Sequence, residues 1–231
     1  MMGKSTEKVT NIYFNWKIYV ILAEIPMEPQ QGSNFRKESI SLFSCFLLCY
    51  IIRLQQAGGL ILSMDTLKKT PLYDVHIALG GKMVDFGGWA LPVQYSSILE
   101  EHKAVRERCG LFDVSHMGEL WVSGEGAFPY LQYMLTNDIT TMTPGRCRYS
   151  MVCYEDGGTV DDVLVYKYSD TDYLVVVNAS NTEKDFEWFA AHAIPTVQVE
   201  NKSAEYAQLA LQGPKFMHCL LYTSPSPRDR G

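Results

Sequence analysis

One stretch in the second half of the chain limits the possible folds more than any other. The run Tyr149–Tyr154 leads to the turn Glu155–Gly158, and the run Thr159–Tyr168 returns from it. β-Branched and aromatic residues bounded by Asp and Gly are typical of a hairpin. The turn Ser169–Asp172 then leads to a third run, Tyr173–Asn178. We therefore predict three consecutive antiparallel strands.

Helical segments flank these three strands. Ser97–Glu100 and Ser180–Glu183 match the capping-box pattern, which predicts helices running from them to Cys109 and to about His192. A short helix is predicted near Ala127–Leu135, with Pro129 in its first turn. The remaining strands are predicted at Phe112–Val122, Val197–Asn201 and Tyr206–Gln212. Hairpins followed by helices indicate an α+β fold, an antiparallel β-sheet with helices packed on one face.

Charge is distributed unevenly along the 231 residues, whose formal net charge is −6. Residues 1–64 carry 6 Lys+Arg and 4 Asp+Glu (+2), residues 65–219 carry 12 and 21 (−9), and residues 220–231 carry 2 and 1 (+1). A net acidic chain argues against nucleic acid as the main partner, because phosphate binding needs a basic face. These changes in net charge along the chain place domain boundaries near Met64 and Cys219.

The two flanks differ from the central domain. Within residues 1–63, the run 40–52 has 13 apolar or small residues, fewer than the ~20 that a membrane-spanning helix needs. Initiation at Met27 would make this run a membrane-targeting signal, and otherwise we expect residues 1–63 to be a disordered or non-native extension. The Ser-Pro repeat of residues 220–231 predicts a disordered tail, either an artefactual end or a target of kinases.

Two adjacent carboxylates, Asp161 and Asp162, interrupt the second strand of the hairpin. Alternation along a strand sends the two side chains to opposite faces, so one of them points toward the sheet interior or a cavity. A carboxylate among Val160, Leu164 and Tyr166 requires hydrogen-bond donors. These donors belong either to a neighbouring loop, in a structural role, or to a ligand rich in N–H groups such as a pterin ring.

Other polar residues carry weaker signals. Gly80-Gly81-Lys82 lacks the full spacing of a phosphate-binding loop, and we predict a turn there. His116 is predicted to lie mid-strand, where a single histidine is typical of a hydrogen-bonded core residue. Cys109 and Cys153 lack a basic partner in a motif. No cysteine or histidine spacing indicates a metal site.

Seven short motifs follow one another in order between residues 65 and 219. They are Lys69–Tyr73, Met83–Trp89, Gly110–Glu119, Leu135–Asp138, Gly157–Asp162, Asn178–Asp185 and Leu211–Pro214. On these motifs, residues 65–219 closely resemble the N-terminal part of the aminomethyltransferases, the T-proteins of the glycine cleavage system.

The resemblance implies a reaction and a set of site residues. Members of this family transfer the aminomethyl carbon from the lipoyl arm of H-protein to tetrahydrofolate, and release ammonia. By analogy, Asp162 is the key carboxylate near the reactive nitrogens of the folate. The folate cavity is expected to be lined by Tyr149, Tyr166, Met117 and Asn178 together with Asp162. Arg146 and Arg148 are a candidate docking site for the acidic, lipoylated H-protein, the alternative being a solvated turn.

The resemblance also implies that this chain lacks parts of a full-length family member. The matching residues make up less than half of a full-length family member, whose later part supplies further folate-gripping residues and a C-terminal barrel. We therefore expect this chain to be truncated and inactive. The alternatives are a non-catalytic folate-binding fragment or the folate domain of a dimethylglycine- or sarcosine-oxidising relative. A start at Met64 favours the stand-alone T-protein and the cytoplasm, and a eukaryotic source would imply the mitochondrial matrix.

Overall fold

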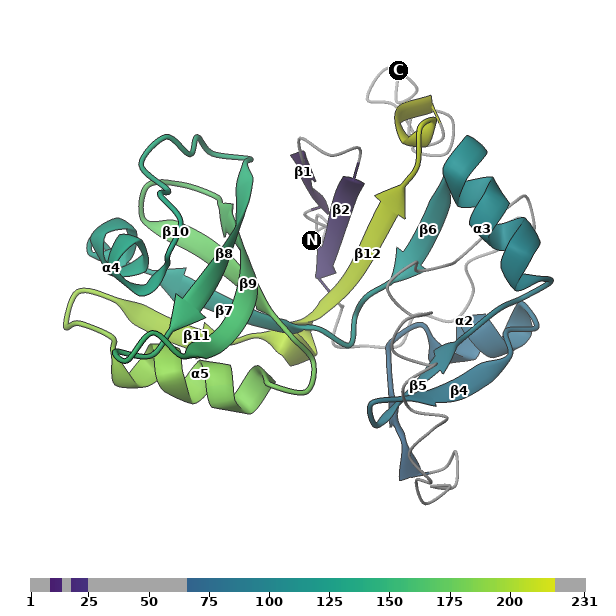
Figure 1. Ribbon diagram of the computed structural model, residues 1–231, viewed down its shortest axis with the longest axis horizontal. Coiled ribbons are helices and arrows are strands. Elements are labelled where there is room, and N and C mark those ends of the chain that lie inside the picture. Colours follow the sequence, from purple (N-terminus) through teal and green to yellow (C-terminus); the bar gives the residue numbers. More distant parts are fainter. Residues whose placement is uncertain (1–8, 14–17, 25–65, 219–231) are drawn as a thin grey trace, which may run out of the picture. The chain divides into compact units, whose positions relative to one another are not determined.

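The computed structural model describes residues 9–13, 18–24 and 66–218 of the chain (Figure 1). Strands β1 (Val9–Tyr13) and β2 (Ile18–Glu24) are the described parts of the first flank. The apolar run 40–52 and the tail 220–231 lie outside the described residues. The expectations for both flanks therefore stay predictions. No helix among the described residues has the length and apolar character needed to cross a membrane.

The larger part of the described chain divides into two compact units. Of the described residues, one unit contains 9–13, 20–24 and Ser115–Gln208, and the other contains 18–19, 66–114 and 209–218. The unit that contains Ser115–Gln208, called the first unit, holds all of the predicted site residues. We describe each unit by itself.

The first unit is built on a five-stranded sheet in the order β11-β7-β10-β9-β8, in which neighbouring strands are antiparallel. The predicted strands 149–154, 159–168 and 173–178 are its consecutive neighbours β8, β9 and β10, so this prediction is confirmed. The strand bounds are β7 Gly118–Ser123, β8 Cys147–Cys153, β9 Thr159–Lys167, β10 Asp172–Val177 and β11 Gln198–Asn201.

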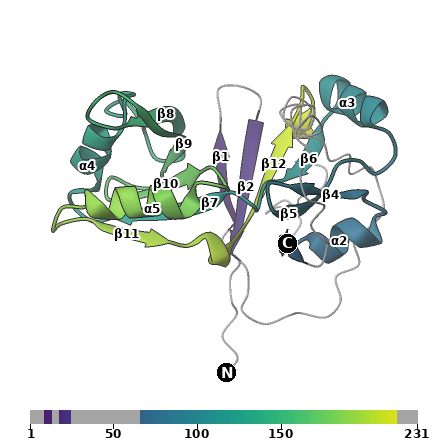
Figure 2. The same ribbon diagram turned by 60° about the horizontal axis from the view of Figure 1, so that its bottom comes forward.

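Two helices of this unit, α4 (Ala127–Met134) and α5 (Thr182–Ala191), share a hydrophobic core with the sheet. Figure 2 shows α5 lying along the strands. Leu131 of α4 and Phe189 of α5 are fully buried in this core with alternate strand residues such as Val165. The Tyr130 hydroxyl donates to the Phe189 carbonyl oxygen and so joins the two helices. The prediction of an antiparallel sheet with packed helices is confirmed.

The prediction of one continuous strand at 112–122 is wrong. The structure has two strands, β6 (Gly110–Asp113) and β7, which belong to different sheets. A turn that includes Ser115 and His116 separates them, so His116 does not lie mid-strand. The Ser115 hydroxyl donates to the Gln208 carbonyl oxygen at 3.3 Å and accepts the Gln208 N–H at 3.0 Å. This pairing with a distant backbone ends the strand, and it cannot be recognised from alternation alone.

Both capping boxes predict helices that exist, α3 (Ile98–Glu107) and α5, but neither N-cap side chain makes a capping bond. At α3, Glu101 Oε1 accepts the backbone N–H groups of Tyr95 and Ser96, at 2.8 and 2.7 Å. At α5 the N-cap residue is Asn181, whose side chain bonds elsewhere. The side-chain capping bonds that the capping-box pattern predicts are therefore not formed at either helix.

The second unit contains a three-stranded sheet in the order β3-β5-β4 and the helices α2 (Tyr73–Ala78) and α3. The strand bounds are β3 Lys68–Lys69, β4 Met83–Phe86 and β5 Trp89–Pro92. Gly87 and Gly88 join β4 to β5 with φ angles of 59° and 89°, which other residues rarely adopt. Strand β12 (Tyr206–Gln212), preceded by the 3-10 turn η2 (Ser203–Glu205), pairs antiparallel with β6.

A buried polar chain links these elements of the second unit. His76 lies 2.8 Å from Asp113 through Nε2 and 2.7 Å from the Tyr95 hydroxyl through Nδ1. The Thr70 hydroxyl donates to the same Asp113 oxygen at 2.7 Å. His76 is only 1% exposed, so these bonds satisfy its ring in an interior that water does not reach.

Candidate functional site

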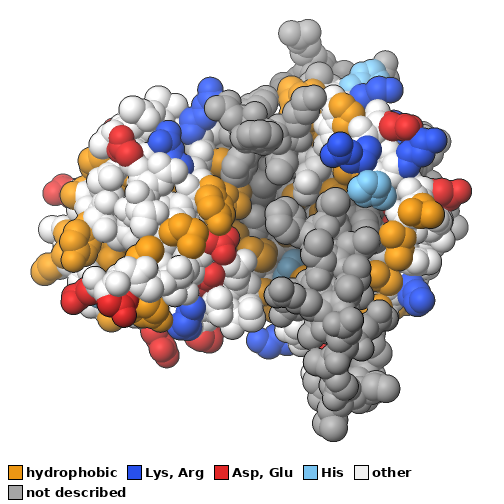
Figure 3. Space-filling model, viewed as in Figure 1, with side chains coloured by type: hydrophobic (Ala, Val, Ile, Leu, Met, Phe, Trp, Pro, Cys, Tyr) orange, Lys and Arg blue, Asp and Glu red, His pale blue; other side chains and the backbone are white. Residues whose placement is uncertain are grey.

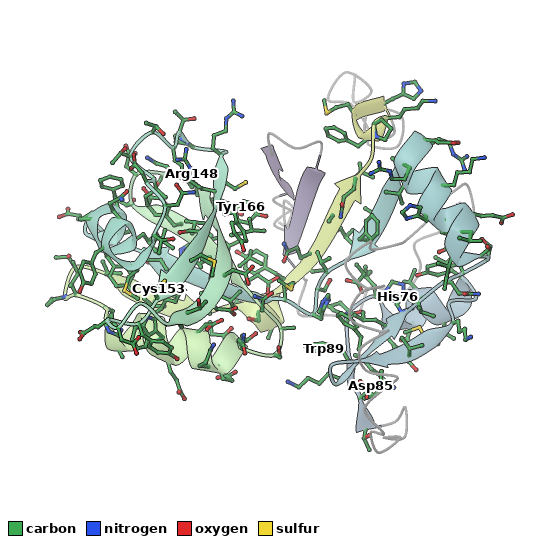
Figure 4. All side chains as sticks on the ribbon, viewed as in Figure 1. His76, Asp85, Trp89, Arg148, Cys153 and Tyr166 are labelled. Atoms are coloured by element: carbon green, nitrogen blue, oxygen red, sulfur yellow. The ribbon has the colours of Figure 1, made fainter. Side chains whose placement is uncertain are left out.

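The candidate site lies on the face of the five-stranded sheet that is turned away from the core of α4 and α5. Along β9, Val163 and Val165 belong to that core. Because side chains alternate along a strand, Asp162, Leu164 and Tyr166 point to the opposite face. We call this the open face, after its accessible part at Asp162, Leu164 and Tyr149; Tyr166 on the same face is fully buried. Figure 4 labels Tyr166 on it.

Strand register brings three predicted site residues together on the open face. Asp162 is paired with Met151 of β8, Leu164 with Tyr149, and Tyr166 with Cys147. Tyr149 is half exposed. Its partial burial, its interaction with the Asp162 carboxylate and the negative charges of Asp162 and Asp161 raise the pKa of the Tyr149 phenol. The phenol therefore stays protonated near Asp162, and its hydroxyl donates to Met151 Sδ at 3.8 Å.

The two adjacent carboxylates have different environments. Asp161 is buried, with 7% exposure, whereas Asp162 is only partly buried. Asp161 accepts hydrogen bonds from Asn178 Nδ2 at 2.9 Å, from Asn181 Nδ2 at 3.0 Å and from the Asp162 backbone N–H at 2.9 Å. Asp161 thus has donors from its own chain, as the structural reading of the pair expects. Asp162 is the carboxylate that remains accessible to a ligand.

Asn178, directly after β10, contacts both carboxylates. Its Nδ2 lies 2.9 Å from Asp161 Oδ1, 3.2 Å from Asp162 Oδ1 and 3.2 Å from the Asp162 carbonyl oxygen. A primary amide nitrogen carries two hydrogens, and these three acceptors use both of them. A ligand on the open face would therefore meet the amide oxygen of Asn178 rather than its nitrogen.

Asn181 and Asp185 complete the surroundings of Asp161, and the sequence analysis did not identify either of them. Asp185 of α5 is 1% exposed. Burial, and after it the neighbouring Asp161 carboxylate, raise the pKa of Asp185 to about 7. Neither carboxyl oxygen of Asp185 has a hydrogen-bond partner among the described residues. Burial disfavours the charged form of Asp161, but the interaction with Asp185 and the hydrogen bonds from Asn178, Asn181 and the Asp162 amide outweigh it and lower the pKa of Asp161. The sequence signal for both residues was their position in the motif Asn178–Asp185, at the start of the helix that follows β10.

Glu119 and Tyr166 are fully buried. No described residue donates a hydrogen bond to either carboxyl oxygen of Glu119, and none pairs with the Tyr166 hydroxyl. Burial raises the pKa of Glu119 to about 9, so the group is neutral near pH 7. Burial, with smaller effects from Cys147, Tyr168 and Glu119, also raises the pKa of Tyr166. Tyr166 thus shares the open face with Asp162 but exposes no surface.

The other predicted site residues lie farther out. Met117 is half-buried in the turn before β7. Arg146 is exposed, whereas the Arg148 guanidinium donates to the Asp138 carbonyl oxygen and, at 3.3 Å, to the Thr141 hydroxyl. Side chains of both charges are interspersed on the surface seen in Figure 3. Within the described ranges, no group of three or more His, Cys, Asp or Glu residues could hold a metal ion.

Comparison with known proteins shows which family this arrangement belongs to. The family model for the GCVT N-terminal domain matches residues 72–225, more than half of the chain. The chain belongs to the GCVT N-terminal domain family. The resemblance on which the sequence analysis relied is thereby confirmed.

The similar members of the GCVT family are bacterial aminomethyltransferases. Those of Bacillus mycoides (strain KBAB4) and Bacillus cytotoxicus are each 59% identical over 152 residues, which cover 66% of this chain. The crystal structure of glycine cleavage system aminomethyltransferase T from Bartonella henselae matches with a TM-score of 0.64 and 35% identity, over 69% of this chain. This structural match confirms the predicted fold.

The chain spans 42% of the length of those two Bacillus relatives and 45% of the Bartonella henselae chain. The matched GCVT domain includes the five-stranded sheet, Asp161, Asp162 and Asn178. More than half of each of these relatives lies outside the matched span. For this chain, the activity of the full-length relatives is a matter of proposal.

Proposed function

We propose that this chain supplies the folate-binding part of a glycine cleavage aminomethyltransferase. In that reaction the aminomethyl carbon passes from the lipoyl arm of H-protein to tetrahydrofolate, giving 5,10-methylenetetrahydrofolate, ammonia and dihydrolipoyl H-protein. The names of the relatives support the reaction class. The observation that carries the proposal is Asp162, a partly accessible carboxylate beside a phenol and an oriented amide.

The groups on the open face suit a reduced pterin. A pterin ring presents several N–H donors, and the open face offers acceptors in the Asp162 carboxylate and the Asn178 amide oxygen. Tyr149, Met151 and Leu164 add partly exposed aromatic and apolar surface on which a flat ring can pack. A charged acceptor bonds more strongly than a neutral one, which favours Asp162 as the main anchor.

In this proposal Asp162 acts by positioning and by its charge. A carboxylate next to the folate nitrogens orients the ring and stabilises the positive charge that develops when a nitrogen attacks the aminomethyl carbon. Asn178 holds the carboxylate, and Tyr149 can pack against the ring. Met117 is assigned a more distant role in the folate cavity, and the fully buried Tyr166 supports the cavity wall from beneath without touching the ligand. The exposed Arg146, with Arg148, is assigned to docking of H-protein.

Calorimetric titration of the whole chain with tetrahydrofolate tests the binding step. We expect saturable binding, weakened about 10–100-fold in Asp162→Asn because a hydrogen bond to a charged acceptor is lost. Glu155→Gln, an exposed charge change in the adjacent β8–β9 turn, is the matched control and should bind like the wild type. Absence of saturable binding would refute the proposal, and equal affinities of all three proteins would remove Asp162 from the site.

Ammonia release from aminomethylated H-protein in the presence of tetrahydrofolate tests the transfer step. A rate above the reaction without protein, abolished in Asp162→Asn, is the result that supports catalysis by this chain. Binding without ammonia release would limit the chain to folate recognition.

A further inference from the structure

The motif Leu135–Asp138 has no part in the proposed site so far, although it lies beside the open face. It follows α4 directly, and Leu135 forms an isolated antiparallel bridge with Val152 of β8. In the five-stranded sheet β8 is an edge strand, paired with β9 on one side. The motif therefore runs along the side of β8 that β9 leaves open. We call residues 135–138 the edge clamp.

The edge clamp bonds to three successive residues of β8. The Thr136 N–H donates to the Met151 carbonyl oxygen at 3.0 Å, and the Met151 N–H donates to Thr136 Oγ1 at 3.2 Å. The Asn137 N–H donates to the hydroxyl of the buried Ser150 at 3.0 Å. Asn137 Nδ2 donates to the Tyr149 carbonyl oxygen, also at 3.0 Å. An edge strand otherwise leaves such backbone groups unpaired, so two polar side chains here take the place of a neighbouring strand.

Two of the three clamped residues, Tyr149 and Met151, form the accessible rim of the open face. Tyr149 is half exposed and Met151 is partly exposed. The Tyr149 hydroxyl donates to Met151 Sδ at 3.8 Å, so the two side chains lie against each other. Exposed side chains on an edge strand have few packed neighbours, and their positions then depend on how firmly their backbone is held. The edge clamp supplies that hold at both residues.

Arg148 joins β8 to the far end of the edge clamp. Its guanidinium donates to the Asp138 carbonyl oxygen and, at 3.3 Å, to the Thr141 hydroxyl. A guanidinium has five N–H donors, so these bonds and the proposed docking contact with H-protein are compatible. Backbone and side-chain bonds thus connect the clamp to each of the residues Arg148, Tyr149, Ser150 and Met151.

We propose that Asn137 and Thr136 are positioning residues for Tyr149 and Met151, so that the edge clamp sets the rim against which a ligand of the open face packs. The proposal deepens the proposed function and rests on it for the contact of this rim with tetrahydrofolate. Without the Asn137 amide, the Tyr149 carbonyl oxygen bonds to water and the edge of β8 opens more readily. The phenol then spends less time against Met151 and near Asp162.

Calorimetric titration of the whole chain with tetrahydrofolate tests the path from Asn137 through Tyr149. Asn137→Ala removes one hydrogen bond to a neutral acceptor, and affinity should fall about 2–10-fold. In a Tyr149→Ala background the same change should alter affinity by less than about twofold, because the residue on which Asn137 acts is gone. Thr143→Ala, an exposed change in the same connection between α4 and β8, is the matched control and should bind like the wild type.

The ultraviolet titration of Tyr149 in the ligand-free whole chain gives a readout that does not depend on folate. Burial and the nearby Asp162 raise the pKa of the Tyr149 phenol, which should fall toward the ordinary value of 10.0 when the clamp is released in Asn137→Ala. Thr136→Val, which keeps the shape but removes the hydroxyl, should have the same effect. Thr136→Ser restores the hydroxyl and should titrate like the wild type. A merely structural role would lower the free energy of unfolding and leave the Tyr149 titration in place.

The outcomes distinguish the two proposals. If the wild type binds no tetrahydrofolate but Asn137→Ala and Thr136→Val lower the Tyr149 pKa, the folate proposal fails and the positioning role stands. A Tyr149 titration unchanged in both variants would overturn the positioning role. So would a loss of affinity in Asn137→Ala that is just as large in the Tyr149→Ala background. If Asn137→Ala does not fold, the Tyr149 titrations of Thr136→Val and Thr136→Ser decide, and equal titrations of these two variants would overturn the proposal.

Discussion

The side-chain amide of Asn178 donates to the buried Asp161 carboxylate across 2.9 Å, and this bond ties the residue after β10 to β9. The same nitrogen lies 3.2 Å from Asp162 Oδ1. Both amide hydrogens of Asn178 bond within the chain, so Asn178 acts on a ligand mainly by holding Asp161 and Asp162 in place. The predicted folate contact of Asn178 is therefore restricted to the amide oxygen.

Replacing Asn178 should affect stability in two distinguishable ways. Asn178→Ala removes hydrogen bonds to charged acceptors and should lower the free energy of unfolding by about 1.5–3 kcal/mol. Asn178→Asp places a third carboxyl group beside Asp161 and Asp162, so its destabilisation should exceed that of Asn178→Ala at pH 8 and shrink as the pH falls to 5. Urea unfolding at the two pH values measures both. Identical losses at both pH values would contradict the assigned contacts.

Asp185 should make the chain less stable as the pH rises from about 4 to 7. Its pKa in the folded chain, about 7, is above the ordinary value of 3.8, so the folded state binds the proton more tightly than the unfolded state. The stability that this provides is complete below pH 4 and is lost as the pH passes through 7. Asp185→Asn should remove this part of the pH dependence, as measured by urea unfolding between pH 4 and 8. Glu183→Gln, an exposed change in the same helix turn, serves as the control.

Glu119 should make the chain lose further stability as the pH rises toward 9. Burial raises its pKa from 4.5 to about 9, so the stability that its protonation provides is complete below pH 4.5 and is lost as the pH rises through 9. Glu119→Gln keeps the size and neutrality of the side chain and should flatten the decline between pH 7 and 9. Glu125→Gln, an exposed change shortly after β7, should leave that decline unchanged. Thermal unfolding at half-unit pH steps makes the comparison.

Tyr149 provides a spectroscopic measure of the Asp162 charge. After burial, the nearby negative charge of Asp162 contributes most to the raised pKa of the Tyr149 phenol. In Asp162→Asn the phenol pKa should therefore fall toward the ordinary value of 10.0. The ultraviolet titration of tyrosinate, taken as the difference from the same protein with Tyr149→Phe, isolates this residue. An unchanged Tyr149 titration in Asp162→Asn would mean that the two side chains do not interact.

Gly118 should not tolerate even one added methyl group. A Cβ at this position would lie 2.6 Å from the Thr182 side chain and 2.6 Å from Val177 Cγ2. Gly118→Ala should therefore destabilise the chain by about 1–3 kcal/mol, the usual cost of overpacking. Adding Val177→Ala to Gly118→Ala frees part of that space, so the double variant should lose less than the sum of the two single losses. Strict additivity in urea unfolding would contradict the predicted clash.

The β8–β9–β10 meander could be predicted from the sequence because its strands are consecutive and its turns are short. The break between β6 and β7 could not, because it depends on a bond between Ser115 and Gln208, which are 93 residues apart. The alternation of side chains along a strand predicted that Asp161 and Asp162 point to opposite faces of the sheet. It did not predict that Asp161 is the buried one. That outcome depends on donors from α5, and helix-to-strand contacts leave no periodic signal in a sequence.

The short connection from β10 to α5 has a consequence for how this chain can change in length. Loops between regular elements usually accept inserted residues. Here Asn178 and Asn181 lie at the two ends of one tight turn, closed by the Asn181 N–H bonding to the Asn178 carbonyl oxygen at 2.9 Å, and both side chains reach the same carboxylate. A single added residue would move one of them away from Asp161. Among natural or designed variants of this chain, insertions should therefore accumulate elsewhere and leave the four residues 178–181 uninterrupted.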